Sequence, residues 1–217
     1  MTDFTLKTDA DGVAVITWDC KAKSMNVMTR DSQQVLNSLI DQVLSDDAIK
    51  GAIITSAKDS FAGGMDLNVL GNIREESGDN PAEGLFNFTM EGHKMLRKIE
   101  RAGMDPKTNK GGKPIATVLP GTAAGIGLEL PLATHRIFAA NNPKAKIGLP
   151  EILVGIFPGA GGTTRLVRKL GAMGASPLLL EGRMNSPEKA LKAGVIDEVC
   201  DDPLNAARAW VLSATDA

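Results

Sequence analysis

A glycine-rich turn between two apolar segments constrains this fold more than any other part of the sequence. An apolar, β-prone run, residues 114–120, leads into the turn, and a second apolar run, residues 128–133, follows it. These patterns predict a buried strand, a turn and the start of a buried helix. Such a turn gathers free backbone N–H groups at a helix N-terminus. They can bind a phosphate, or an oxygen that becomes negative during a reaction.

Two glutamates stand in matching apolar surroundings near this turn. Glu129 is the single acidic residue among leucines at the expected helix start, and Glu151 is the single acidic residue in the apolar run 149–154. Taken alone, Glu129 is also compatible with a role in balancing the helix dipole, and Glu151 with a solvated position. Because both flank a glycine-rich turn, we predict that both are catalytic. Apolar neighbours raise the pKa of a carboxyl by desolvation, so one acid can stay protonated near neutral pH.

The remaining patterns predict an α/β chain in which strands and helices alternate. A hairpin is expected from residues 4–7 and 13–18, which flank a turn ending at Gly12. Further strands are expected at residues 49–55, 137–140, 146–148 and 195–199. Helices are expected after Thr29, over 86–99, after the segment 158–165, after Ser186 and over 203–212. Residues 104–112 are expected to form a flexible surface insert.

Length and composition narrow the classes of function. A chain of 217 residues without a linker-like stretch is expected to form one domain with a sizeable core. A net charge of −2 and an aromatic content of 4% argue against a nucleic-acid partner. Cys20 and Cys200 lack metal-ligand spacing, so we expect no metal and a reducing compartment. Without a secretory signal or an apolar run of about 18 residues, we expect a cytoplasmic protein that does not span a membrane.

Several other residues have a simpler structural interpretation. His93 and His135 have no partners at ligand spacing, and Arg165 is expected to form a structural ion pair. The glycines of residues 159–162 are not followed by a P-loop lysine, so they favour close packing over phosphate binding. Ser60 has no accompanying triad pattern, so hydrolytic chemistry is not expected.

Taken together, four segments resemble the crotonase (enoyl-CoA hydratase/isomerase) superfamily. They are residues 60–67 (SFAGGMDL), 121–130 (GTAAGIGLEL), 147–152 (IGLPEI) and 158–163 (PGAGGT). The resemblance extends from about residue 10 to about residue 200, and the chain is similar in particular to the N-terminal hydratase domain of the multifunctional fatty-acid-oxidation complex α-subunit. It implies a crotonase (ClpP-like) fold of repeated ββα units, a homo-oligomer of the trimer type and a CoA thioester substrate.

The resemblance also implies roles for residues at the two glycine-bearing loops. It assigns the backbone N–H groups that hold the thioester oxygen, the oxyanion hole, to Met65 and Ile126, and it places Gly64 and Gly125 at the substrate. The family usually has three consecutive glycines where this chain has Gly-Ile-Gly at 125–127. If the middle position required a positive φ, a β-branched Ile126 would be strained there.

Further roles follow from the resemblance. Glu129 corresponds to the glutamate that acts with water, and Glu151 to the one that exchanges a proton at the α-carbon. Lys23 and Met25 lie where the family contacts the CoA phosphates or adenine, although Lys23 is equally compatible with a plain surface lysine. Asp66 is expected to orient its loop and not to be catalytic.

Three functional hypotheses remain open. The first is reversible hydration of 2-trans-enoyl-CoA in fatty-acid β-oxidation, with CoA as part of the substrate and no separate cofactor. The second is a Δ3,Δ2-enoyl-CoA isomerase, which needs only a proton shuttle and the oxyanion hole. The third is a catalytically weak acyl-CoA-binding or assembly module, suggested by Ile126 and by the insert 104–112, which we expect near the thioester channel.

The resemblance gives an expectation for the region beyond Cys200. Only residues 201–217 follow it, enough for one helix, whereas family members have further C-terminal helices that cover the acyl pocket. We therefore expect an N-terminal hydratase fragment of a longer polypeptide, which in the complex would also meet thiolase subunits. Apolar surface is then expected to be exposed, or buried by self-association.

Overall fold

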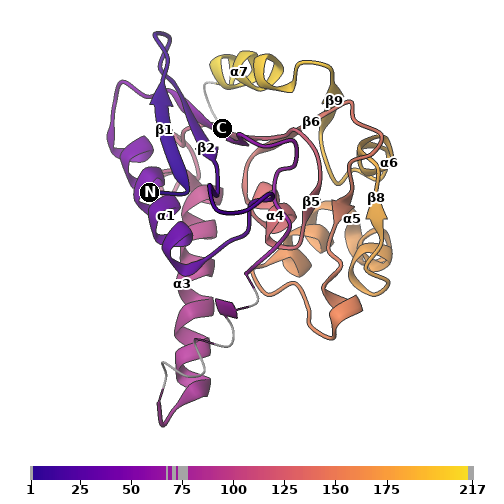
Figure 1. The fold of residues 1–217 in the computed structure, drawn as a ribbon. Helices are drawn as coiled ribbons and strands as arrows, with labels where there is room; N and C mark the ends of the chain where they lie inside the picture. Colours follow the sequence, from indigo (N-terminus) through magenta and orange to yellow (C-terminus); the bar gives the residue numbers. More distant parts are fainter. Residues whose placement is uncertain (1, 67, 70–71, 73–77, 215–217) are drawn as a thin grey trace.

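The computed structural model describes residues 2–66, 68–69, 72 and 78–214. Its main element is a six-stranded sheet in the order β1-β2-β3-β4-β6-β9 (Figure 1). β1 pairs with β2 in antiparallel orientation, and the other neighbours are parallel. The strands are β1 (Phe4–Thr8), β2 (Val13–Trp18), β3 (Gly51–Ser56), β4 (Ile115–Leu119), β6 (Arg136–Ala140) and β9 (Glu198–Cys200).

A smaller sheet and the helices complete the fold. The smaller sheet has the order β5-β7-β8 and consists of β5 (Ala123–Ala124), β7 (Ile147–Gly148) and β8 (Met184–Asn185). The helices are α1 (Arg30–Ser45), α3 (Pro81–Arg101), α4 (Ile126–Glu129), α5 (Gly162–Leu179), α6 (Pro187–Lys192) and α7 (Pro203–Ser213). Two 3-10 helices are η1 (Pro131–Ala133) and η2 (Glu151–Val154).

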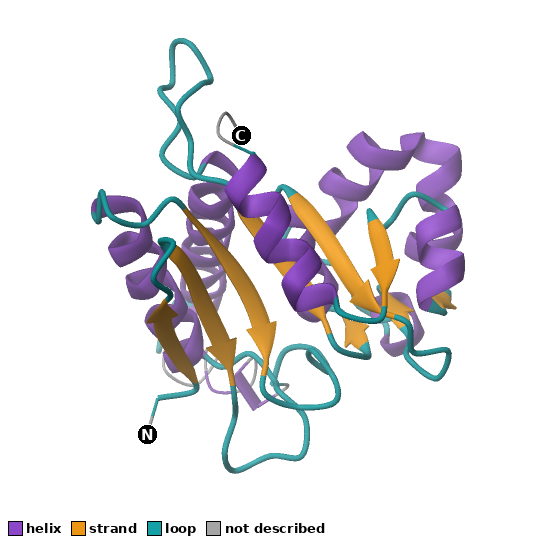
Figure 2. Cartoon of the chain, turned by 90° about the horizontal axis from the view of Figure 1, so that it is seen from above, coloured by secondary structure: helices purple, strands orange, loops and turns teal. Residues whose placement is uncertain are grey.

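The main sheet is buried on both faces, which explains why its central strands are nearly all apolar. Ile54 of β3 faces a large core shared with α1 and α3, whereas its neighbour Ile53 faces a smaller core under α7. Figure 2 shows α7, beside the C-terminus, lying across one face of the sheet with α1 and α3 behind the other. The α/β class predicted from the sequence is confirmed, and so are ββα units, for example β4-β5-α4 and β6-β7 followed by α5.

Some element boundaries differ from the prediction. The strand expected over 195–199 begins only at Glu198, because Gly194 ends α6 with a φ of 76° and the N–H of Val195 then donates to the carbonyl of Ala190. α3 begins before the predicted residue 86, at Pro81, since Asn80 caps it and accepts from the N–H of Glu83. Among the described residues, no helix is both long enough and apolar enough to cross a membrane.

Candidate active site

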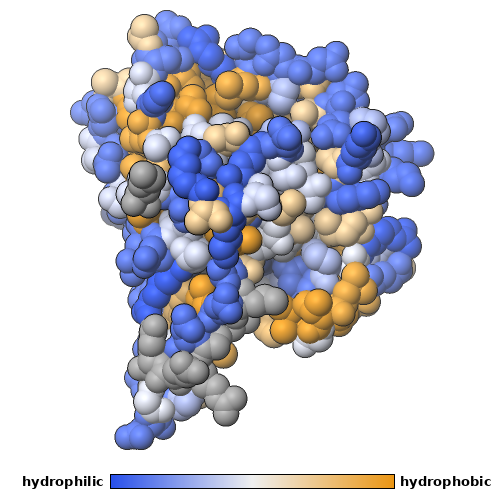
Figure 3. Space-filling model, viewed as in Figure 1, coloured by the Kyte–Doolittle hydropathy of each residue, from blue (hydrophilic) through white to orange (hydrophobic). Residues whose placement is uncertain are grey.

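A cavity of about 500 Å³ lies between α3, the loop after β3, the turn before α4 and the segment 150–160. Its wall is mainly apolar, and α3 contributes Phe88, Met95 and Leu96 to it. The segment 150–160 also presents apolar side chains to solvent. They gather on the lower right of the face shown in Figure 3, with exposed fractions of 69% for Leu153 and 74% for Phe157.

Asn26 holds the loop after β3 in place. Its buried side-chain amide donates to the carbonyl oxygens of Trp18 and Phe61, at 3.2 and 3.0 Å. The backbone carbonyl oxygen of Asn26 accepts from the N–H of Gly63 at 2.8 Å. A single buried asparagine thus connects β2 to the loop that ends at Met65. The sequence pattern gave no role to Asn26, because most of its partners are backbone groups that only the fold brings to it.

Gly125 brings the two loops and one glutamate together. Its φ of 57° and ψ of −126° suit glycine, and a Cβ there would lie 3.3 Å from Oε1 of Glu151 and 3.6 Å from Cα of Gly64. The turn and the loop pack so closely that a Cβ on Gly127 would lie 2.8 Å from the carbonyl oxygen of Ala62.

Ile126 is not strained in this turn. The only non-glycine residues with positive φ in the described part of the chain are Ala102 and Asn109. The side chain of Ile126 is buried, with 5% exposure, and it belongs to the main core. The condition for strain is therefore not met, because the positive φ falls on Gly125 and not on the residue after it.

Met65 and Ile126, the residues predicted to form the oxyanion hole, both line the cavity. Met65 forms a parallel bridge with Met28, in which the N–H of Met28 and that of Asp66 make the hydrogen bonds. The N–H of Met65 and that of Ile126 donate to no acceptor within the described part of the chain. Two residues that border the same space therefore each have a backbone N–H without a partner among the described residues, and their role as an oxyanion hole stays a prediction.

Glu129 is held deep in the wall of the cavity. Only 3% of the residue is exposed, and its Oε1 accepts from the N–H groups of Ala160 at 2.9 Å and Gly162 at 2.8 Å. Burial raises the pKa of Glu129 from 4.5 to about 7, against the lowering effect of the hydrogen bond from Gly162. Repulsion from Glu151 also contributes to this rise in the pKa of Glu129. The side chain therefore changes charge near neutral pH.

Glu151 begins η2 and faces the same cavity. Burial raises the pKa of its carboxyl. Its Oε2 is buried without a hydrogen-bond partner among the described residues. An unpartnered buried carboxyl oxygen is costly, so such atoms are characteristic of functional sites. The structure thus brings the two predicted catalytic carboxyls together.

The other predicted substrate-binding residues divide into two groups. Gly64 and Gly125 line the cavity, as expected, whereas Lys23 and Met25 are not among its lining residues. Lys23 pairs with Asp66 at the surface, and this hydrogen bond lowers the pKa of Asp66. Met25 packs on the glycine loop, with Sδ 2.6 Å from the position of a Cβ on Gly63. Both residues adjoin the loop, and their contact with CoA stays a prediction.

Residues predicted to be structural have structural partners. His93 bonds the carbonyl oxygen of Gly159, His135 accepts from the N–H of Ile115, and Arg165 pairs with Glu100. The insert 104–112 follows the C-terminal end of α3, and none of the described cavity-lining residues belongs to it. The expectation that it lies near the channel is therefore wrong, because α3 presents its earlier turns, and not its end, to the cavity.

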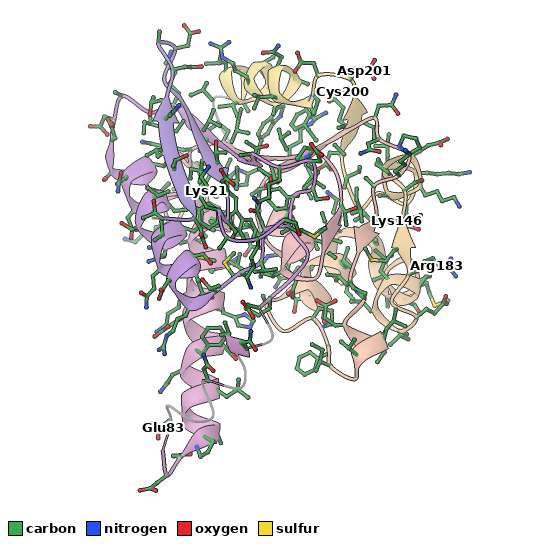
Figure 4. The ribbon with its side chains drawn as sticks, viewed as in Figure 1. Lys21, Glu83, Lys146, Arg183, Cys200 and Asp201 are labelled. Carbon is green, nitrogen blue, oxygen red and sulfur yellow. The ribbon has the colours of Figure 1, made fainter. Side chains whose placement is uncertain are left out.

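Cys200 takes no part in this site. Figure 4 shows Cys200 and Asp201 at the top of the molecule, at the end of β9, whereas Glu83 marks the projecting start of α3 at the bottom. Burial raises the pKa of the Cys200 thiol, which makes it less reactive as a nucleophile.

Comparisons with known proteins identify sequences and folds similar to this chain. The family described as enoyl-CoA hydratase/isomerase matches residues 8–214. Similar curated relatives are the fatty acid oxidation complex subunit alpha of Shewanella halifaxensis, 30% identical over 202 residues, and that of Idiomarina loihiensis, 34% identical over 197 residues. The matches cover 93% and 90% of this chain but 26% of each relative. The chain thus spans about a quarter of their length.

Solved structures show the same fold. An enoyl-CoA hydratase from Geobacillus kaustophilus superimposes with a TM-score of 0.83 at 27% identity, covering 99% of this chain and 75% of that one. An enoyl-CoA hydratase from Thermoplasma volcanium has a TM-score of 0.78 at 25% identity, covering 97% and 75%.

Proposed function

Because this chain belongs to the enoyl-CoA hydratase/isomerase family, we propose that it adds water reversibly to 2-trans-enoyl-CoA thioesters of fatty-acid β-oxidation. The observation that supports this most is that Glu129, Glu151, Met65 and Ile126 line one apolar cavity, and that the N–H groups of the last two have no acceptor among the described residues. The proposed reaction needs no separate metal or redox group, since CoA enters as part of the substrate.

The proposed hydration transfers two protons. The Glu129 carboxylate accepts a proton from water while the water oxygen forms a bond to the β-carbon. The electrons of the double bond move toward the thioester oxygen, which gains negative charge and accepts hydrogen bonds from Met65 and Ile126. The Glu151 carboxyl then gives its proton to the α-carbon. The pKa of Glu129, about 7, suits this exchange, since a carboxyl with a pKa near neutrality can both take and return a proton. Burial also raises the pKa of Glu151, which favours the protonated form that the step needs.

The amide donors and the carboxyls contribute comparably to this reaction. Loss of one donor in an oxyanion hole costs about 3 kcal/mol of transition-state stabilisation. Loss of a general acid or base costs about 10²- to 10⁴-fold in rate. The apolar wall strengthens both effects by excluding water from the reacting atoms.

An assay of crotonyl-CoA hydration and of longer 2-enoyl-CoAs tests the proposal. Glu129→Gln and Glu151→Gln should each lower kcat by about 100-fold or more. Glu91→Gln, at an exposed position of α3, should leave it unchanged and serves as the control. A wild-type protein that binds acyl-CoA and hydrates no chain length would show that the proposed function is wrong.

A Δ3,Δ2-enoyl-CoA isomerase is the second candidate, and one observation favours it. Glu129 is already bound by two amides, whereas Oε2 of Glu151 has no partner among the described residues and is free to carry a proton between two carbons. Glu129→Gln separates the alternatives: hydration should collapse, while isomerisation through Glu151 should continue. The third hypothesis, a catalytically weak module, was suggested by two features, and neither supports it now. Ile126 has no positive φ, and no residue of the insert 104–112 is among the described residues that line the cavity.

A further inference from the structure

The two amides that hold Glu129 belong to peptide groups whose carbonyls are also held. The N–H of Ala160 shares its peptide group with the carbonyl of Gly159, and the N–H of Gly162 shares its own with the carbonyl of Gly161. A peptide group is planar and trans, so its N–H and C=O point in opposite directions. Whatever fixes the carbonyl therefore also fixes the direction in which the N–H points toward Glu129.

His93 and Arg165 bind these carbonyls. Nε2 of His93 donates to the carbonyl oxygen of Gly159 at 2.8 Å, since a carbonyl can only accept. The backbone N–H of Arg165 donates to the carbonyl oxygen of Gly161 at 3.0 Å. The peptide group between these two consists of the carbonyl of Ala160 and the N–H of Gly161, and the side chain of Arg165 holds it, since Nη1 donates to that carbonyl oxygen at 3.1 Å. Three successive carbonyls are thus held by two residues.

Arg165 is itself held in place by α3. Its side chain is only 11% exposed, and Nη2 pairs with Oε2 of Glu100 at 3.3 Å. His93 and Glu100 are seven residues apart on α3, so they lie on one face of that helix, two turns apart. A Cβ on Gly161, whose φ is 96°, would lie 2.4 Å from Nη1 of Arg165. Glycine at that position allows both the backbone conformation and the approach of the guanidinium.

We propose that His93 and Arg165 are positioning residues, which connect α3 to the peptide groups of 159–162 and thereby fix the place and ionisation of the Glu129 carboxyl. Neither residue lines the cavity, so we assign neither a contact with the reacting atoms. The kinetic part of this inference rests on the proposed hydration, whereas the part that concerns the Glu129 carboxyl does not.

The charged groups near Glu129 set the direction of the expected change. Glu151, from η2, raises the pKa of Glu129, and Arg165, from α5, lowers it. The hydrogen bonds from residues 160 and 162 also lower it, because they favour the charged form. When the peptide groups lose their fixed direction these hydrogen bonds weaken, so the Glu129 carboxyl should titrate at a higher pH.

The test uses two variants and matched controls in the full chain. His93→Leu removes one carbonyl donor, and His93→Gln restores an N–H at a similar distance. Arg165→Lys keeps the charge but not the two-point contact. Arg168→Leu is the control for α5, since Arg168 is 69% exposed and contacts the same Glu100 but none of these carbonyls. Lys94→Gln, at an exposed neighbouring position, is the control for α3.

The first measurement is the titration of the Glu129 carboxyl by ¹³C NMR in glutamate-labelled protein, with the signal assigned by its absence from Glu129→Gln. His93→Leu and Arg165→Lys should titrate at higher pH than the wild type, and the two controls should not. The second is hydration kinetics, in which kcat should fall about 10- to 100-fold while KM changes little, since the substrate contacts remain. His93→Gln should restore most of the wild-type kcat and bring the titration of the Glu129 carboxyl close to that of the wild type.

The outcomes separate the two claims. If the wild type hydrates no enoyl-CoA, the proposed function fails, but the titration still decides the positioning role. If folded His93→Leu and Arg165→Lys titrate as the wild type does and keep its kcat, the positioning role is wrong. A fall in kcat that His93→Gln does not recover, with an unchanged titration, would also overturn it.

Discussion

At the residue scale, Glu129 combines two opposing influences on its charge. Two backbone amides favour the carboxylate, and burial favours the neutral acid. Burial is the larger effect, because the pKa of Glu129 rises from 4.5 to about 7 despite both hydrogen bonds. A group with this pKa responds to small changes in its surroundings, which suits a residue that must exchange protons at neutral pH.

The raised pKa predicts that Glu129→Gln makes the protein more stable at high pH. Because the folded-state pKa lies above the unfolded value, Glu129 contributes stability below pH 4.5 that is lost as pH rises through about 7. Glutamine keeps an oxygen that can accept from both amides and carries no charge. At pH 8 the variant should exceed the wild type by about 3 kcal/mol in free energy of unfolding, measured with urea.

The difference in free energy of unfolding between Glu129→Gln and the wild type should shrink as pH falls from 7 to 5. The control variant Glu91→Gln should show no such trend. A constant difference over that range would contradict the raised pKa of Glu129. Activity should move in the opposite direction to stability, as expected where a buried charge serves catalysis.

The same pKa predicts the acidic limb of the pH profile. If Glu129 takes the proton of water, the reaction needs it ionised, so kcat/KM for hydration should fall about tenfold per pH unit below about pH 7. The limb should be absent from the residual activity of Glu129→Gln. A profile that stays flat down to pH 5 would show that Glu129 is not the base.

Ile126 also has a testable role at this scale. Its buried side chain packs in the core and its N–H is free, so a glycine at this position should not improve the site. Ile126→Gly should lower the free energy of unfolding by about 4 kcal/mol, from lost packing and added backbone freedom. Ile126→Val should cost about 1 kcal/mol and keep hydration near the wild-type rate. Urea denaturation and kcat measure the two effects, and a Gly variant of unchanged stability would contradict this.

At the scale of elements, the start of α5 sets how closely Glu129 can approach the backbone. A Cβ on Gly162 would lie 2.8 Å from Cγ of Glu129 and 2.9 Å from Cδ1 of Leu149. The nearest such atom for Gly159, in the same segment, is 3.8 Å away. Neither glycine has a positive φ, so an alanine would not strain the backbone at either position. The two alanine variants should therefore differ only in the space available for the added methyl group.

We therefore expect Gly162→Ala to displace Glu129 and Gly159→Ala to be tolerated. A shift of about 1 Å in a catalytic group costs on the order of 100-fold in rate, so kcat of the first variant should fall by about that factor. The second variant should stay within about twofold of the wild type, since its carbonyl still accepts from His93. Equal rates in the two variants would mean that the close packing of Gly162 has no catalytic consequence.

Patterns of neighbouring residues predicted most helices and strands. The elements that they did not predict depend on contacts between residues far apart in the sequence. Thr29 and Ser186 cap their helices as expected, because an N-cap depends on a few neighbouring residues. β8 was not predicted, since two residues have no recognisable period and pair only with β7. The helix expected after the segment 158–165 is α5, and its kink at Gly171, where φ is 72° and ψ is 166°, was not predicted.

The sequence predicted the two carboxyls that line the cavity, but not the contacts that hold them. Glu129 and Glu151 stand out in the sequence because a lone acid in an apolar run is unusual, and both line the cavity. His93 and Asn26 do not stand out, because most of their partners are backbone carbonyls and amides that only the fold brings to them. Backbone partners leave no trace in residue types, so only the folded arrangement reveals them.

At the scale of the whole molecule, the main sheet separates the site from α7. Val211 of α7 is 2% exposed and packs with Val13, Ile53 and Phe138 on the face away from the cavity. Arg208 of the same helix pairs with Asp9, so α7 also joins the β1–β2 hairpin. Changes in α7 should therefore alter stability without altering the chemistry.

Val211→Ala tests this separation. It removes two methyl groups from a filled core and should lower the free energy of unfolding by about 2 kcal/mol, measured with urea. Leu204→Ala, at a position 43% exposed in the same helix, should change it by less than about 0.5 kcal/mol. Both variants should hydrate enoyl-CoA at the wild-type rate per folded molecule. A lower rate in folded Val211→Ala would show that the two faces are coupled.

The strands of the main sheet lie side by side in the order in which the ribosome makes them, from β1 to β9. Each new strand therefore finds its neighbour already in place, and the sheet can grow during translation, since chains begin to fold as they emerge. The helix that covers one face of the sheet, α7, is translated later, because it follows all six strands in the sequence. A nascent chain paused before residue 203 would expose Val13, Ile53 and Phe138 together, and we expect a chaperone to bind it at that stage.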